Sequence, residues 1–289
     1  MSTDVSYPGV KAVATAIGQV LNRAKIPNLL FGWTALAVIL VDFGFPDIDF
    51  IIPDKEVSHA IKALTKAGYK LCTSPDCSER DEDRGAHLGK ALNRFHPVPA
   101  AHFHISAAAG PGYVLSLLKK DDIIPHLPNL KLGLPERKEY EHLTLSNDPR
   151  LPPRAEGGPS GPWYRLDPVR VLLARTLTEA LLLLRCRHID TRPALDNLWC
   201  DMLWEIMKAN LLITGFSHEF DHPPKGYLYL FWRNYIIATR IADTTPENSV
   251  ARKQKSDAEV RQFRAYLIAD GKDPSDKYSW LRKKTGNYA

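Results

Sequence analysis

Leu29-Leu-Phe-Gly-Trp-Thr34 and Phe45-Pro-Asp-Ile-Asp-Phe-Ile-Ile52 are the two stretches that decide the fold of this chain. The first predicts a short buried strand that ends at Gly32 and leads into a short helix. The second predicts another strand, which opens with Asp47 and Asp49. This order of strand, glycine, helix and strand indicates a mixed sheet with helices in the front half of the protein.

Asp47 and Asp49 are the first candidates for chemistry. Side chains alternate along a strand, so both carboxylates project from the same face, a few ångströms apart. Two carboxylates that close repel each other unless a cation lies between them, and Mg²⁺ takes oxygen ligands of this kind. The alternative is a solvated pair at the start of a strand, without chemistry. The upstream turn at Gly32 favours the metal site.

The rest of the front half predicts further elements around this unit. Apolar residues at helical spacing predict helices over 10–24 and 55–67, and Gly68 ends the second of them. We expect strands over 69–73, 101–106 and 113–118, and a polar surface loop over 74–90.

Residues 126–164 are rich in proline and glycine and predict a linker. Beyond it, Asp167-Pro168 has the form of a helix start and Ser256-Asp-Ala-Glu259 that of a capping box. Helices are expected over 167–186, 193–213 and 227–241 and from 256 onward. We therefore predict an α+β fold, with a mixed α/β domain over 1–125 and a helical domain over 165–289.

Composition excludes several classes of protein. The 289 residues are 44% hydrophobic and 25% charged, as in an ordinary globular protein. No apolar run approaches the roughly 20 residues that a membrane span needs, so we expect no membrane partner. The first residues lack a signal sequence, which predicts a cytoplasmic location. The four cysteines do not predict a disulfide scaffold, and Cys72 and Cys77 with His87 lack the tight spacing of a structural zinc site.

The segment 252–289 carries the whole net charge of +5, because it holds ten Lys or Arg and five Asp or Glu. Aromatic residues are interleaved with these charges. Cations that meet phosphates and rings that stack on bases are what RNA or tRNA binding requires. The alternative is a solvated basic helix whose aromatic side chains pack inward.

Phe31-Gly32-Trp33, then thirteen residues, then Asp47-Ile-Asp-Phe50 resembles the nucleotidyltransferase-fold superfamily, as a divergent, fungal-type member. The resemblance covers roughly residues 10–120. It implies that Asp47 and Asp49 ligate Mg²⁺, that Gly32 lets the backbone approach a nucleotide triphosphate, and that a nucleotidyl group passes to a small-molecule or RNA acceptor. That acceptor would lie between the α/β and helical domains.

Two departures from the family pattern concern this site. Trp33 stands where the family has glycine or serine, although the neighbouring Thr34 supplies a hydroxyl. The third carboxylate of the family is also missing. The corresponding strand is taken to be 101–106, and it contains no Asp or Glu. There, His102 and His104 alternate onto one face, and one of them could act as the base. The alternative is a pair of ordinary strand histidines.

Three further residues are weaker candidates. His96, before Pro97, is a lesser choice for the third member of the site. Lys119 and Lys120 could contact phosphate from a strand end, or form a solvated turn.

The leading hypothesis is thus a Mg²⁺-dependent nucleotidyltransferase-like enzyme. A second is a repurposed, inactive scaffold that binds RNA or tRNA through the basic segment. A third, tied to no motif here, is an aminoacyl-tRNA-using cyclodipeptide synthase of fungal biosynthesis.

Overall fold

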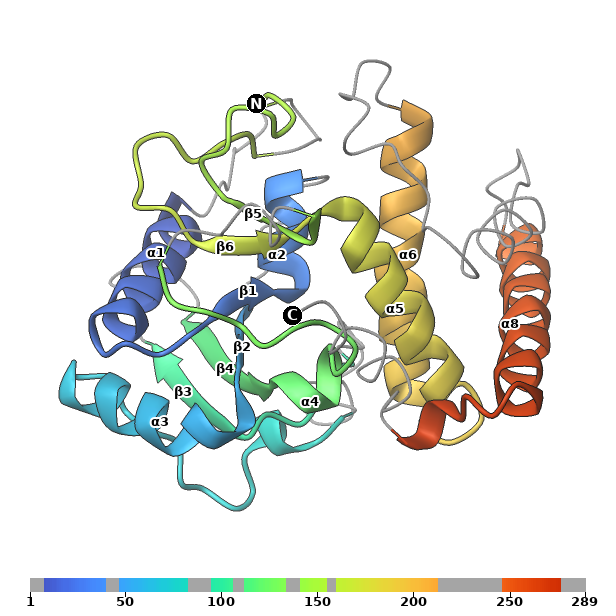
Figure 1. Ribbon diagram of the computed structural model, residues 1–289, viewed down its shortest axis with the longest axis horizontal. Helices are drawn as coiled ribbons and strands as arrows, with labels where there is room; N and C mark the ends of the chain where they lie inside the picture. The colour runs from blue at the N-terminus through green and yellow to red at the C-terminus, as the bar shows by residue number, and fades with distance from the viewer. Residues whose placement is uncertain are drawn as a thin grey trace.

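The computed structural model describes residues 8–39, 47–82, 95–105, 112–133, 141–154, 160–212 and 246–276. It is a mixed α+β structure in which a four-stranded sheet lies beside a group of helices from the second half of the chain (Figure 1). Within these ranges, no helix combines the length and the apolar character needed to cross a membrane.

The main sheet has the strand order β1-β2-β4-β3. β2 lies in its interior, antiparallel to β1 and parallel to β4, and β3 runs antiparallel to β4 at the far edge. The four predicted strands of this sheet are confirmed to within one residue at either end. Their bounds are Leu29–Phe31 (β1), Asp47–Ile52 (β2), Ala101–Ile105 (β3) and Tyr113–Lys119 (β4).

The two faces of the sheet are covered by different parts of the chain. Helix α1 (Pro8–Arg23) covers the face that carries Phe50, since a Cβ on Gly18 would lie 3.7 Å from the Phe50 ring. α1 also packs on α3 (Val57–Lys66). The opposite face meets the helices of the second half, because the rings of Phe31 and Trp199 are 6.3 Å apart.

Those helices pack around a buried arginine. Arg185 has no exposed surface and donates to Asp196 at 2.8 Å, to Ser256 at 2.5 Å and to Asp257 at 2.5 Å. One guanidinium therefore ties three helices together. They are α5 (Ala174–His188), α6 (Pro193–Leu212) and α8 (Pro246–Ala269).

The proline- and glycine-rich segment 126–164 contains ordered structure. Its strand β5 (Leu143–Leu145) pairs with β6 (Arg170–Leu172), and Trp163 from the same segment is buried. The buried apolar residues of both halves belong to one continuous core. The remaining elements are α2 (Gly32–Ile39), α4 (Lys120–Ile123), and the short helices η1 (Asp54–Glu56), η2 (Ser78–Arg80) and η5 (Pro274–Asp276).

Three predictions of local structure were wrong. The expected strand 69–73 is reduced to an isolated bridge between Leu71 and Phe103. The helix expected from 167 begins at residue 174, because 170–172 extends to pair with β5. Ser256 does not cap a helix, since α8 begins ten residues earlier and the Ser256 hydroxyl accepts from Arg185. The expected helix 227–241 lies outside the described residues, as do 83–90 of the polar loop and 277–289 of the basic segment.

Candidate functional site

Asp47 and Asp49 lie on the interior strand β2 and point to the face covered by the C-terminal helices. Asp49 is in register with Phe31 of β1, whose ring meets Trp199 on that face. Both carboxylates are buried, with exposed fractions of 4% and 3%. The prediction that the two acids share one face is confirmed by the register of the strand.

Gly32 packs directly against Asp49. It has a φ of +68° at the start of α2, and a Cβ built there would lie 2.3 Å from Asp49 Oδ2. Glycine is therefore required both by the backbone conformation and by the carboxylate beside it.

The two residues after Gly32 are used within the fold. The Thr34 hydroxyl donates to the backbone carbonyl of Asp47 at 2.5 Å, so it fastens α2 to the start of β2. Trp33 is half-buried and packs against the hydrophobic core.

His96 is the side chain that the fold brings to Asp49. Its Nε2 lies 2.8 Å from Asp49 Oδ1, and its Nδ1 lies 2.7 Å from the carbonyl oxygen of Pro97. A carbonyl oxygen only accepts, so Nδ1 carries a hydrogen. A second proton must then lie between Nε2 and Asp49, because two lone pairs would repel. The buried pair is therefore an imidazolium with a carboxylate, or a neutral imidazole with a carboxylic acid.

Ser116 occupies the position on β4 that is level with Asp49. It is fully buried, and its hydroxyl has no hydrogen-bond partner among the described residues. The strand next to β2 is β4, and the strand 101–106, where the sequence interpretation looks for a third catalytic group, is one strand further away. No local pattern connects residue 116 or residue 96 with residue 49, so the sequence analysis gives His96 a lesser place and does not name Ser116.

His102 and His104 lie on the same face as the aspartates, but at the edge of the sheet. His102 pairs with Ser116 and His104 with Val114, which places them two strands, about 10 Å, from Asp49 and Asp47. Their Nε2 atoms instead contact Cys77 Sγ at 3.2 and 3.3 Å. The structure does not bring either histidine to the aspartate pair.

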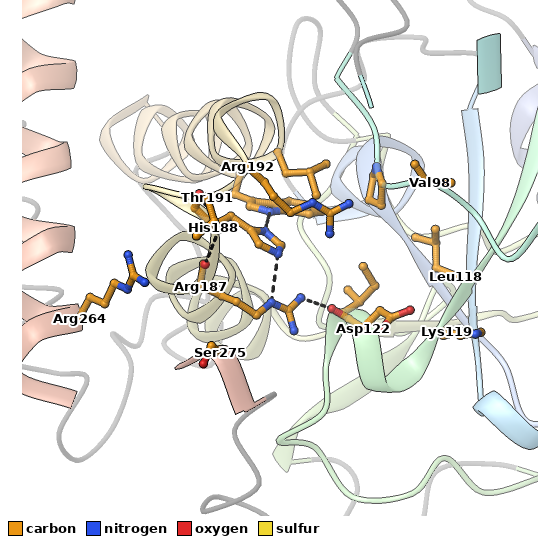
Figure 2. A pocket seen from close by; sticks show the side chains of 14 residues that line it. Val98, Leu118, Lys119, Asp122, Arg187, His188, Thr191, Arg192, Arg264 and Ser275 are labelled. Atoms are coloured by element: carbon orange, nitrogen blue, oxygen red, sulfur yellow. Dashed lines mark hydrogen bonds between the residues drawn. The ribbon is translucent and has the colours of Figure 1, made fainter. Parts of the chain in front are cut away.

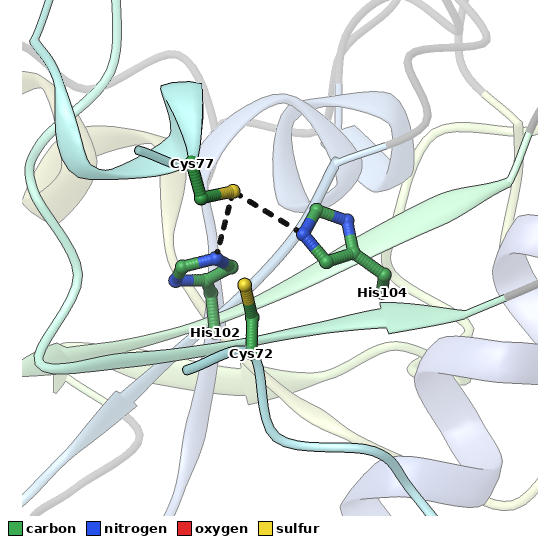
Figure 3. A group of neighbouring side chains, drawn as sticks. All are labelled: Cys72, Cys77, His102 and His104. Carbon is green, nitrogen blue, oxygen red and sulfur yellow. Dashed lines mark hydrogen bonds between the residues drawn. The ribbon is translucent and has the colours of Figure 1, made fainter. Parts of the chain in front are cut away.

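A second group of side chains is thus centred on β3. Its four members are the only His, Cys, Asp or Glu side chains in the described part of the chain that gather three or more ligand atoms closely enough to share a metal ion. They are Cys72, Cys77, His102 and His104, called the Cys–His cluster below (Figure 3). The sequence argument against zinc had paired the cysteines with His87, which lies outside the described residues.

Lys119 and Lys120 stand at the other end of the strands from Asp47. Lys119 pairs with Ile52, three residues beyond Asp49 and thus about 10 Å along the strand. Lys120 is buried and donates to the carbonyl oxygen of Ile124 at 3.2 Å. Only Lys119 is exposed, and it lines the pocket described next.

A pocket of about 360 Å³ lies between the sheet and the helices of the second half (Figure 2). Leu118 on its wall shares a face with Ser116 and is one side-chain repeat, about 7 Å, further along β4. Pro97, the neighbour of His96, forms another part of the wall. The pocket therefore lies near the Asp49–His96 pair, although neither of these residues lines it.

Most of the charged side chains that line this pocket are cationic. They are one acid, Asp122, and four basic residues, namely Lys119, Arg187, Arg192 and Arg264. Two of these cations are paired with acids outside the lining, Arg192 with Glu82 and Arg264 with Asp190. His188 adds no charge at neutral pH, because burial and the nearby Arg187 lower its pKa to about 3. An anionic ligand is the kind that such a lining attracts.

The described part of the basic segment has much of its charge paired within the fold. Arg261 and Arg264 donate to Asp190 at 3.0 and 2.6 Å, and Lys253 donates to Asp257 at 2.8 Å. Phe263 is buried, in keeping with the packed alternative, whereas Tyr266 is exposed.

No known protein family matches the chain, and none of the curated proteins does.

Proposed function

We propose that the protein transfers a nucleotidyl group and that Asp47 and Asp49 hold the divalent cation for this reaction. The observation that carries the proposal is the packing of two buried carboxylates on one strand face, with Gly32 fitted against one of them. Two neighbouring buried acids are costly to ionise together, and His96 lies against only one of them. A cation held by both carboxylates would offset that cost.

The donor set fits Mg²⁺. Mg²⁺ is usually held by one or two protein carboxylates, with phosphate oxygens and water completing its octahedral shell. When bound, it polarises a phosphoryl group and offsets the charge that develops during transfer. The order of β1, Gly32, α2 and β2 supports the resemblance to nucleotidyltransferases on which this role rests.

His96 acts in this proposal as a positioning residue for Asp49. Its Nε2 holds one carboxylate oxygen, while the other lies against Gly32, so the orientation of the carboxylate is fixed from both sides. The Nδ1 contact with Pro97 fixes the imidazole in turn. Such support of a metal ligand commonly changes affinity by about 10- to 100-fold when it is removed.

The basic pocket is the proposed site for the anionic part of the nucleotide or of the acceptor. It lies on the same sheet face as Asp49, and its cations come from both the end of β4 and the helices. Closure of the sheet against α5 and α6 also excludes water from the buried carboxylates, which strengthens electrostatic interactions there.

Calorimetric titration with the four nucleoside triphosphates, with and without Mg²⁺, tests the proposal. We expect binding that requires Mg²⁺ and that is lost in the Asp47→Asn/Asp49→Asn protein. Asp167→Asn is the matched control, because Asp167 is exposed and far along the chain from the site. Circular dichroism of each variant establishes that the fold is retained.

Failure of every triphosphate to bind the native protein would overturn the proposal. Equal binding by the native and doubly substituted proteins would also overturn it. In either case RNA or tRNA binding through residues 252–289 becomes the next hypothesis. It predicts that truncation of this segment weakens RNA binding and reduces its salt dependence.

A further inference from the structure

Four side chains of the Cys–His cluster point toward a common centre (Figure 3). Their ligand atoms, two sulfurs and two imidazole nitrogens, all lie within 4.8 Å of one another. Cys77 Sγ is 3.2 Å from His102 Nε2 and 3.3 Å from His104 Nε2. Three of the four residues are at least partly buried, and His104 faces solvent.

The geometry of the sheet edge places these residues together. His102 and His104 are two apart on β3 and so share a face. The bridge between Leu71 and Phe103 puts the next residue, Cys72, level with His102, and the Cys72 amide donates to the His102 carbonyl at 3.0 Å. The turn that follows then returns the chain over this face and delivers Cys77.

We propose that the Cys–His cluster binds one zinc ion in a closed, four-coordinate site. Two thiolates and two imidazoles form a standard ligand set for structural zinc. With Zn–S near 2.3 Å and Zn–N near 2.0 Å, tetrahedral geometry places sulfur and nitrogen ligands about 3.5 Å apart. The two contacts of Cys77 with the histidines are within about 0.3 Å of that value.

Four protein ligands leave no open position, so this site holds structure and performs no hydrolysis. The ion would hold the turn 73–77 against the outer edge of β3. In the described part of the chain, the backbone contacts at this edge are the bridge between Leu71 and Phe103 and the hydrogen bond from Cys72 to His102. Unlike the nucleotidyl-transfer proposal, this assignment does not depend on what Asp47 and Asp49 bind.

A disulfide between Cys72 and Cys77 is the competing chemistry for two neighbouring thiols. It would leave no reason for two imidazole nitrogens to converge on the same sulfur. It also differs from a zinc site in its response to alkylation, because a disulfide is not modified until it is reduced, whereas cysteines around zinc react once the metal is chelated.

The test is the metal content of the full chain, purified under reducing conditions without a histidine tag. We expect about one zinc ion per chain, and uptake of Co²⁺ with the ligand-field and thiolate charge-transfer bands of a tetrahedral S₂N₂ site. Cys77→Ser and His104→Gln should lose both signals. The matched controls, Cys200→Ser and His59→Gln, lie outside the cluster and should keep them.

Absence of zinc from the native protein, together with no Co²⁺ spectrum after reduction, would overturn the assignment. Full zinc content in Cys72→Ser/Cys77→Ser would do the same. A Cys72–Cys77 disulfide, found by mass spectrometry in a second preparation of the native protein made without reductant, would replace zinc as the explanation. Since the native protein alone decides two of these outcomes, a variant that misfolds does not obscure the result.

Discussion

The aspartate pair and the Cys–His cluster lie on the same face of one sheet, yet they differ in ligand atoms, in burial and in their place in the sheet. The aspartates lie on the interior strand β2 and offer buried oxygen atoms. The cluster lies at the edge strand β3 and offers sulfur and nitrogen atoms, partly exposed. Ser116, on the strand between them, separates the two groups.

Under the two proposals, the two groups of side chains would bind different ions. Carboxylate oxygens favour hard cations such as Mg²⁺, whereas thiolate and imidazole favour zinc. A site with two protein carboxylates leaves positions for substrate, but a site with four protein ligands does not. Chemistry is therefore expected at the centre of the sheet and structural support at its edge.

The largest expected effect is that of Asp47→Asn/Asp49→Asn, which should abolish nucleotide binding without changing zinc content. Loss of both carboxylates removes the proposed cation ligands, so affinity for Mg²⁺-nucleotide should fall at least about 100-fold. Zinc content, measured on the same preparation, should not change. Cys77→Ser should give the reverse pattern, with zinc lost and nucleotide affinity altered less than about 10-fold. Joint loss of both properties in either variant would contradict the separation.

Gly32→Ala should reveal how tightly the aspartate site is packed. Gly32 and Gly271 both have a φ of +68°, but a Cβ at 271 meets nothing within 4 Å. We expect Gly271→Ala to cost about 1 kcal/mol of unfolding free energy, and Gly32→Ala about 3 kcal/mol because Asp49 must also leave His96. Denaturant unfolding of the two proteins measures the difference. Equal costs would show that the carboxylate moves freely.

Removal of zinc should lower the thermal stability of the protein by releasing the turn 73–77 from the edge of the sheet. If zinc links the turn 73–77 to β3, a strong chelator should lower the unfolding midpoint of the native protein by about 5 °C or more. The Cys77→Ser protein, which has no zinc to lose, should show the same midpoint with and without chelator. Differential scanning calorimetry provides the measurement, and a native midpoint unaffected by chelation would argue against the link.

The smallest expected effect is a decrease in unfolding free energy in acid, caused by protonation of His188 at the interface between sheet and helices. Burial and Arg187 lower its pKa from 6.5 to about 3, so between these values the unfolded chain binds a proton that the folded protein does not. Stability from this residue is therefore complete above pH 6.5 and is lost as the pH falls toward 3. From pH 7 to pH 5 the loss should be about 1–2 kcal/mol.

His188→Gln tests this assignment. The variant should show a shallower decrease of unfolding free energy with acid, whereas His59→Gln, at an exposed position, should follow the native curve. Parallel curves for all three proteins would assign the acid sensitivity to other groups.

Local sequence patterns were sufficient for the main sheet and for the shared face of Asp47 and Asp49. Alternation along a strand is a property of consecutive residues, so it can be read without knowing the partner strands. The same rule correctly placed His102 and His104 together. It failed to identify their neighbours, because facing the same side of a strand does not specify which loop covers that side.

Patterns also failed where pairing overruled local preference. Asp167-Pro168 is a good helix start, yet 170–172 forms β6 because β5 offers it a partner. Leu71 lies in an expected strand, but makes only a bridge at the edge of β3. In both places the hydrogen bonds available from distant segments decided the conformation.

The sequence by itself determined four strands, the glycine turn before α2 and the pair of acids on one face. The tertiary structure alone decided that His96 holds Asp49, that Ser116 stands beside it, that the C-terminal helices close a cationic pocket over the same face, and that two cysteines meet two histidines. The physical reason is range. Side-chain alternation and backbone preference act over a few residues. These contacts join residues that are far apart in the sequence, 25 positions for Cys77 and His102 and 47 for Asp49 and His96, so they depend on the path of the chain between them.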